Sequence, residues 1–120
     1  MLCGGQRTGG TMTAPNSIGV QKCIKRSLKN AGIDASEIDL IVGHLTGTMG
    51  DKIEMNNWME ALEMTKERFP YINSVKSLIG HCLSAAGSIE CVSALLQLHN
   101  NFVQPNINCE DIHEDIGLNN

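Results

Sequence analysis

Two short segments hold the residues best suited to chemistry, and each contains a histidine among small neighbours. Residues 43–51 read GHLTGTMGD, and residues 76–81 read KSLIGH. A histidine changes its protonation state near neutral pH, so it can donate or accept a proton. Each histidine lies where a strand or a helix is expected to meet a loop. We therefore expect His44 and His81 to form two walls of one active site.

Taken one at a time, these residues have simpler interpretations. A histidine at a strand end, such as His44, more often has a hydrogen-bonded structural role. For His81, at a helix start, structural and functional roles are equally favoured. Lys76 alone would be a surface lysine. A metal site built from the two histidines and Glu54 is less favoured, because no pair of ligands has the short helical spacing typical of zinc sites. The joint arrangement indicates catalysis, and no metal is predicted.

The elements that position these histidines follow from the spacing of apolar residues. Pro15 and Asn16 can start a helix that runs at helical periodicity to a stop at Gly32. Two short apolar runs, residues 40–43 and residues 71–75, predict buried strands that each precede one histidine motif.

A second helix is predicted directly after the first motif. Asp51 and Glu54 have the D-x-x-E spacing of a capping box, which predicts a helix start at Asp51, and Pro70 limits its end. The residues expected to face inward are Ile53, Trp58 and Leu62, with Met55 as a further candidate.

The segment from His81 to Leu96 is apolar or small on every face. It carries one charge, Glu90, in sixteen residues. A helix of this kind is buried on all sides. With a third strand beginning at residues 102–103, the order α-β-α-β-α-β predicts an α/β fold: a layered mixed sheet with helices and a central buried helix after His81.

Composition narrows the classes of function. The 120 residues make one domain or half of a larger one, and a formal net charge of −4 gives no reason to expect nucleic-acid binding. Five scattered cysteines without a C-x-x-C pair favour a reducing compartment. No run resembles a signal peptide or a membrane span, so a cytoplasmic location is expected.

Together the motifs resemble the C-terminal half of the β-ketoacyl-[acyl-carrier-protein] synthases, condensing enzymes of the thiolase-like superfamily. The resemblance rests on MTAP at residues 12–15, H-x-T-G-T at 44–48, G-D-x-x-E at 50–54, K-S-x-x-G-H at 76–81 and AAG at 85–87. It covers nearly the whole chain. Residues 1–120 are therefore expected to be a C-terminal ketoacyl-synthase domain that lacks the family's N-terminal half and its nucleophilic cysteine.

The resemblance implies a decarboxylative Claisen condensation. The family's cysteine carries an acyl thioester, malonyl carrier protein loses carbon dioxide, and the resulting carbanion attacks the thioester. His44 and His81 would stabilise the enolate through Nε2–H donors aimed at the oxygen where charge develops. The implied partners are acyl carrier protein, the missing N-terminal half and a second copy in a homodimer. No cofactor is implied beyond the carrier protein's phosphopantetheine.

The same resemblance assigns the other site residues. Lys76 matches a lysine that holds the histidine network, Glu54 matches its paired acid, and Asp51 would cap the helix. Thr46 and Thr48 match threonines that hydrogen-bond the pantetheine arm. A hydroxyl suits this amide-rich arm because it can both donate and accept a hydrogen bond. We expect the two histidines within about 8 Å of each other, and a mostly buried Lys76–Glu54 pair.

Three departures from the family pattern stand out. Leu45 occupies a position that is usually glycine and should narrow the space beside His44. The loop after Thr48 is one residue shorter. None of the cysteines has the nucleophile's context, and Cys82 beside His81 is more typical of packing.

Several functions stay open. The favoured one is part of an active synthase, inactive as these 120 residues alone; the alternative is a catalytically silent subunit of the chain-length-factor kind. An interaction domain and a thiolase, which has cysteine where this chain has His81, are less favoured. Acyl chain length and the pathway (fatty acid, polyketide or polyene) are not encoded in these motifs.

The first predicted helix carries four basic residues on one face, which is expected to face either solvent or an acidic carrier protein. These residues are Lys22, Lys25, Arg26 and Lys29.

Overall fold

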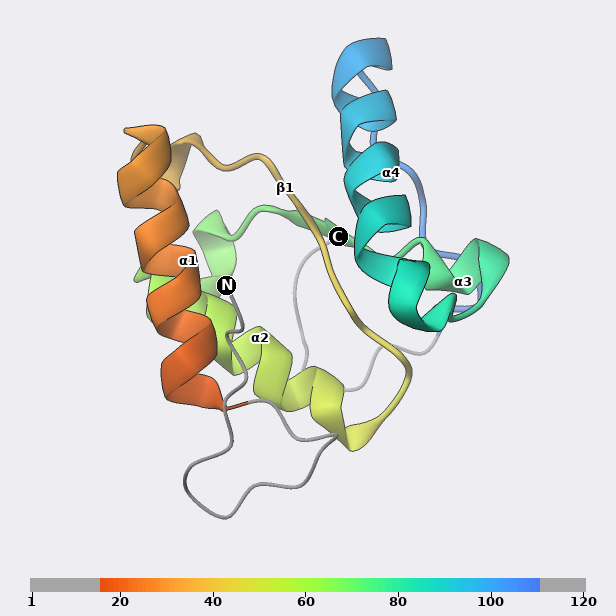
Figure 1. The fold of residues 1–120 in the computed structure, drawn as a ribbon, viewed down its shortest axis with the longest axis horizontal. Helices are drawn as coiled ribbons and strands as arrows, with labels where there is room; N and C mark the ends of the chain where they lie inside the picture. The colour runs from red at the N-terminus through yellow and green to blue at the C-terminus, as the bar shows by residue number, and fades with distance from the viewer. Residues whose placement is uncertain (1–15, 111–120) are drawn as a thin grey trace.

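A two-stranded parallel sheet forms the centre of the structure (Figure 1). The structure is a computed structural model that describes residues 16–110, so the MTAP motif at residues 12–15 lies outside the described part. Strand β1 (Leu40–Val42) pairs with β2 (Tyr71–Asn73), and Ile41 lies opposite Ile72. The predicted α/β class is confirmed.

Helices flank the sheet on both sides. In Figure 1, α1 (Ser17–Ala31) and α2 (Met49–Leu62) lie to the left of β1, whereas α3 (Lys76–Ile79) and α4 (Ala86–Asn100) lie to its right. Three short 3-10 turns complete the described elements: Ala35–Glu37, Lys66–Arg68 and Leu83–Ala85. Within residues 16–110, no helix is long and apolar enough to cross a bilayer.

Helix α1 has the ends that the sequence predicts. Asn16 Oδ1 accepts the backbone N–H of Gly19 at 3.1 Å and so satisfies a donor of the first turn. At the other end, Gly32 has φ 69° and donates its N–H to the Leu28 carbonyl oxygen at 2.9 Å. This left-handed conformation, which glycine adopts without steric cost, closes the helix.

The predicted start of the second helix is wrong. Helix α2 begins at Met49, and its N-cap is Thr48, whose Oγ1 accepts the backbone N–H of Gly50 at 3.3 Å. Asp51 and Glu54 form no capping box. Their carboxylates bind the preceding loop instead, because that loop presents backbone N–H groups that have no strand partner.

The hydrophobic core lies between α2 and the sheet. Met55, Trp58 and Ile72 form its buried cluster, with Met55 and Trp58 facing inward as predicted. Ile53 is 41% exposed, so its predicted burial is wrong. Gly43 packs against the Trp58 indole so closely that a Cβ there would lie 2.5 Å from Cη2. The residue before His44 is thus held by contact with the core.

The segment after His81 differs from the prediction in two respects. The chain first passes through the turn Leu83–Ala85, and α4 starts only at Ala86. Its buried residues are Ala86 and Gln97, while Leu95 is 59% and Leu98 79% exposed. The described residues therefore leave most of this apolar helix uncovered.

The predicted third strand is absent from the described residues. Residues 102–103 lie in a segment without regular secondary structure, and side-chain amides connect this segment to the rest of the fold. Gln97 Oε1 accepts both the Asn73 Nδ2–H at 2.6 Å and the Gln104 backbone N–H at 2.8 Å. Because these amides satisfy the backbone, the segment needs no ladder of strand hydrogen bonds.

Candidate active site

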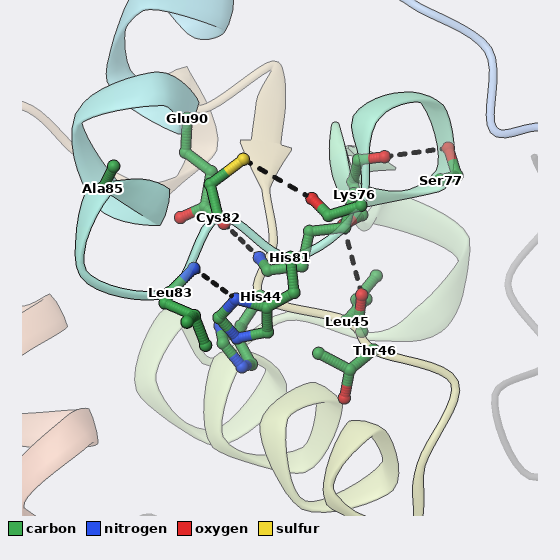
Figure 2. Close-up of polar contacts among 12 residues, drawn as sticks. His44, Leu45, Thr46, Lys76, Ser77, His81, Cys82, Leu83, Ala85 and Glu90 are labelled. Carbon is green, nitrogen blue, oxygen red and sulfur yellow. Dashed lines mark hydrogen bonds and ion pairs between the residues drawn. The ribbon is translucent and has the colours of Figure 1, made fainter.

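The two histidines meet in space, although 37 positions separate them in the sequence. His44 follows β1, and His81 lies in the turn between α3 and α4. Their ring centroids are 5.0 Å apart, with an interplanar angle of 77° (Figure 2). Both residues are exposed. The predicted convergence is confirmed, and it forms a site at the carboxyl end of β1.

A backbone contact sets the tautomer of the neutral His81 ring. Its Nδ1 accepts the backbone N–H of Leu83 at 2.9 Å (Figure 2). A ring nitrogen that accepts a hydrogen bond holds no proton, so the neutral imidazole has its proton on Nε2. Cys82, with φ −83° and ψ 23°, turns the chain so that the N–H of the next residue, Leu83, faces the ring. His81 can therefore offer Nε2–H to a substrate.

Glu54 fixes the backbone at His44. Its Oε1 accepts the N–H of His44 at 2.7 Å, and its Oε2 accepts the N–H of Leu45 at 3.1 Å. Burial raises the pKa of Glu54 above its ordinary value of 4.5. The two backbone donors and the charge of His44 act in the opposite direction, but burial outweighs them.

Asp51 continues the same arrangement one turn earlier in α2. Its Oδ1 accepts the N–H of Thr46 at 3.0 Å, and its Oδ2 accepts the N–H of Gly47 at 2.8 Å. Two carboxylates of one helix thus bind the N–H groups of the four consecutive residues 44–47. The predicted role of Asp51 as a helix cap is wrong, and its observed role is to hold the loop that bears His44.

Lys76 forms an ion pair with Glu90 rather than with Glu54, so the predicted partner is wrong (Figure 2). The side chains of Lys76 and Glu90 are 6% and 18% exposed. Glu54 is not the partner because its carboxylate binds the His44 loop. Sequence reasoning missed Glu90, yet a signal was present: a single charge in a long uncharged segment requires a partner when it is buried.

The two threonines lie together on the His44 loop. Their Oγ1 atoms are 3.1 Å apart, and either can be the donor. Thr48 Oγ1 also caps α2, and Thr46 Oγ1 lies 3.5 Å from Asp51 Oδ1. Both threonines are exposed. Binding of a pantetheine arm by these hydroxyls stays a prediction.

Two neighbours of the histidines have different surroundings. Leu45 packs against the core cluster, and the narrowing of the space beside His44 stays a prediction. Cys82 is half-buried, its Sγ lies 3.9 Å from the carbonyl oxygen of Gly80, and it lines a shallow recess with Lys76 and Glu90. The part of the chain that the structure describes contains no cluster of three or more metal-ligating side chains.

Comparisons with known proteins agree with these motifs. The family model of the β-ketoacyl synthase C-terminal domain matches residues 3–110. The chain is 37% identical to 3-oxoacyl-[acyl-carrier-protein] synthase I, chloroplastic, of Arabidopsis thaliana, over 81% of this chain and 21% of that protein. It is 35% identical to 3-oxoacyl-[acyl-carrier-protein] synthase 1 of Escherichia coli K12, over 97% of this chain and 28% of that protein.

A third relative, 3-oxoacyl-[acyl-carrier-protein] synthase 1 of Haemophilus influenzae, is 37% identical over 92% of this chain and 26% of its own length. The chain thus spans between 21% and 28% of the length of these three relatives. The family match extends over most of the sequence and includes both histidine motifs. The chain therefore belongs to the β-ketoacyl synthase C-terminal domain family.

Proposed function

We propose that this chain supplies the two histidines of a β-ketoacyl-[acyl-carrier-protein] synthase, which joins an acyl thioester to a malonyl thioester with loss of carbon dioxide. The observation that carries the proposal is the 5.0 Å separation of the His44 and His81 ring centroids. Two imidazoles at this distance can both reach one reacting oxygen. Family membership and the names of the relatives support the same function.

The reaction needs stabilisation of charge at the malonyl thioester oxygen. The bond between the malonyl carboxylate and C2 breaks, carbon dioxide leaves, and the electron pair moves to C2 and the thioester oxygen as an enolate. The Nε2–H of His81, fixed by the Leu83 N–H, donates to this oxygen, and His44 donates from the other side. Donors that are already oriented stabilise the charge without reorganisation.

The carbon–carbon bond forms in the next step. C2 of the enolate attacks the carbonyl carbon of the acyl thioester, and the sulfur of the family's nucleophilic cysteine leaves as a thiolate that takes up a proton. The product is a β-ketoacyl thioester. In this proposal the cysteine comes from a segment of the protein outside these 120 residues, and the chain alone does not catalyse the condensation.

Other residues of the site have supporting roles in this proposal. Lys76, held by Glu90, places a fixed positive charge in the segment that leads to His81. Thr46 and Thr48 bind the pantetheine arm of acyl carrier protein, which is the partner and brings the substrate without a further cofactor. We propose a homodimer in the cytoplasm that serves fatty acid synthesis, with polyketide or polyene synthesis as the alternative pathways.

The test is malonyl-carrier-protein decarboxylation by the complete polypeptide that the gene encodes. We expect His44→Ala and His81→Ala each to lower the rate about a hundredfold, the scale of losing one oriented donor to a developing oxyanion. His99→Ala is the matched control, since His99 is exposed in the last turn of α4.

Unchanged rates in both site variants would contradict the proposal. A wild-type polypeptide that binds acyl carrier protein but neither decarboxylates nor condenses would instead indicate the silent subunit of the chain-length-factor kind.

A further inference from the structure

Two hydrogen bonds connect the His44 loop to the segment that leads to His81, and they lie on either side of His44. The Gly43 N–H donates to the Asn73 carbonyl oxygen at 2.8 Å. The Ser74 Oγ–H donates to the Leu45 carbonyl oxygen at 3.2 Å. The residues before and after His44 are thus attached to two consecutive residues at the end of β2.

Ser74 also reaches toward the second histidine. Its carbonyl oxygen accepts the N–H of Ser77 at 3.2 Å and the Ser77 hydroxyl at 3.0 Å. Ser77 lies in α3, the short helix that directly precedes the His81 turn. Ser74 is 5% exposed. One buried residue therefore bonds to the backbone of both histidine-bearing segments.

A side chain from the other end of the described region fixes Ser74 in turn. Asn106 Oδ1 accepts the Ser74 N–H at 2.9 Å, and Asn106 Nδ2 donates to the Ile72 carbonyl oxygen at 3.0 Å. A neighbouring strand would bond to β2 in the same way, through an N–H and a C=O two residues apart. Residues 101–110 form no strand. The side-chain amide of Asn106 makes these two hydrogen bonds in place of a strand.

The carboxylates of α2 do not connect the His44 loop to the segment that carries His81. Glu54 and Asp51 attach the His44 loop to their own helix. They hold the loop in shape, but they do not relate it to the segment that carries His81. That relation depends on the end of β2, where Ser74 is the residue whose side chain makes the connection.

We propose that Ser74 and Asn106 are positioning residues that set the distance between the His44 and His81 rings. They act through the backbone of Leu45 and Ser77. The catalytic consequence rests on the proposed function, since only an enzyme that uses both histidines depends on their spacing. A displacement of about 1 Å in a reacting group can lower a rate about a hundredfold.

The first measurement is structural and does not require activity. Nuclear Overhauser effects between the ring protons of His44 and His81 are recorded for wild type, Ser74→Ala and Asn106→Ala. We expect this cross-peak to weaken in both variants. Ser36→Ala and Asn100→Ala are matched controls, because each removes a side-chain hydrogen bond at an exposed position elsewhere, and both should retain the wild-type intensity.

The second measurement is catalytic and uses the complete polypeptide. We expect kcat for decarboxylation to fall about tenfold in Ser74→Ala and Asn106→Ala while KM for malonyl carrier protein stays within about twofold, because the substrate contacts are unchanged. A loss of folded protein alone would lower the active concentration and leave the ring cross-peak of the folded fraction intact.

Wild-type cross-peak intensity in both variants overturns the proposal, whatever the activity. If Ser74→Ala does not fold, Ser74→Cys takes its place, since it keeps the side-chain shape and is a weak donor. A wild-type protein without condensing activity, combined with a weakened cross-peak in the variants, supports the positioning role and rejects the proposed function. The two failures are therefore distinguishable.

Discussion

The Lys76 ammonium and the Glu90 carboxylate form an ion pair that joins α3 to α4 across the turn that carries His81. Both side chains are largely buried. The charges must therefore compensate each other, because an isolated charge in this position would lack both water and a partner. The pair fixes the two ends of the His81 turn relative to each other.

Removal of one member of this pair should strongly destabilise the fold. We expect Lys76→Ala to lower the free energy of unfolding by about 3–5 kcal/mol, because Glu90 is left buried without a partner. Urea denaturation monitored by Trp58 fluorescence measures this loss. Lys25→Ala is the control, since the Lys25–Glu63 pair is 51% and 76% exposed and surface pairs contribute little. A Lys76→Ala variant as stable as the control would contradict a buried pair.

Local signals made part of this structure predictable from the sequence. Asn16 and Gly32 bind backbone groups within four residues of themselves, so the ends of α1 could be predicted from side-chain and backbone preferences alone. The two strands likewise follow from short apolar runs. For α1 the deciding interactions are near in sequence, whereas the apolar runs marked the strands and left their pairing, Leu40 with Tyr71, undetermined.

Features decided by distant partners could not be predicted in the same way. The D-x-x-E pattern of Asp51 and Glu54 is a valid cap signal, but the N–H groups of residues 44–47 compete for the same carboxylates. The partner of Lys76 depends on how α4 folds back after the His81 turn, which placed Glu90 and not Glu54 beside it. The histidine pair was predictable because each histidine follows an expected strand or helix among small residues, and the family resemblance relates the same two segments.

Opposite pKa shifts are expected for two glutamates of the chain. Glu54 should titrate above 4.5, chiefly because it is buried. The pKa of Glu63 should lie below 4.5, because Lys25 donates a hydrogen bond to its carboxylate and places a positive charge beside it. Carbon-13 NMR of the carboxyl groups measures both. Lys25→Ala should return Glu63 to its ordinary range and leave Glu54 unchanged, and an unshifted Glu54 would contradict its burial.

The raised pKa of Glu54 also determines in which direction stability changes with pH. The folded chain holds this proton at pH values at which the unfolded chain has lost it. The Glu54 contribution to the free energy of unfolding is therefore fully present below pH 4.5 and is lost as the pH rises through the raised pKa. Chemical denaturation between pH 4 and 7 should show that the free energy of unfolding of the wild type, relative to that of Glu54→Gln, falls as the pH rises. A difference that does not change with pH would contradict the raised pKa.

A methyl group at Gly43 should disturb both the core and the first histidine. Its Cβ would lie 2.5 Å from Trp58 Cη2, and overpacking of this kind costs about 1–3 kcal/mol. Gly87→Ala is the matched control, because a Cβ there meets nothing within 4 Å and the residue lies in α4. Thermal denaturation should show a lower midpoint for Gly43→Ala and an equal or higher one for Gly87→Ala. Equal midpoints for Gly43→Ala and wild type would mean that the indole moves aside freely.

The uncovered face of α4 should make the 120-residue chain self-associate. Leu95, Leu96 and Leu98 are all more than half exposed, and apolar patches beyond a few hundred Å² usually bind a partner. Sedimentation at several concentrations should show an average mass that rises with concentration. Leu95→Lys should shift this equilibrium toward monomer, because the charge opposes burial of the patch. Ile18→Lys, a substitution at an exposed apolar residue of α1, should not. A monomer at every concentration would contradict this prediction.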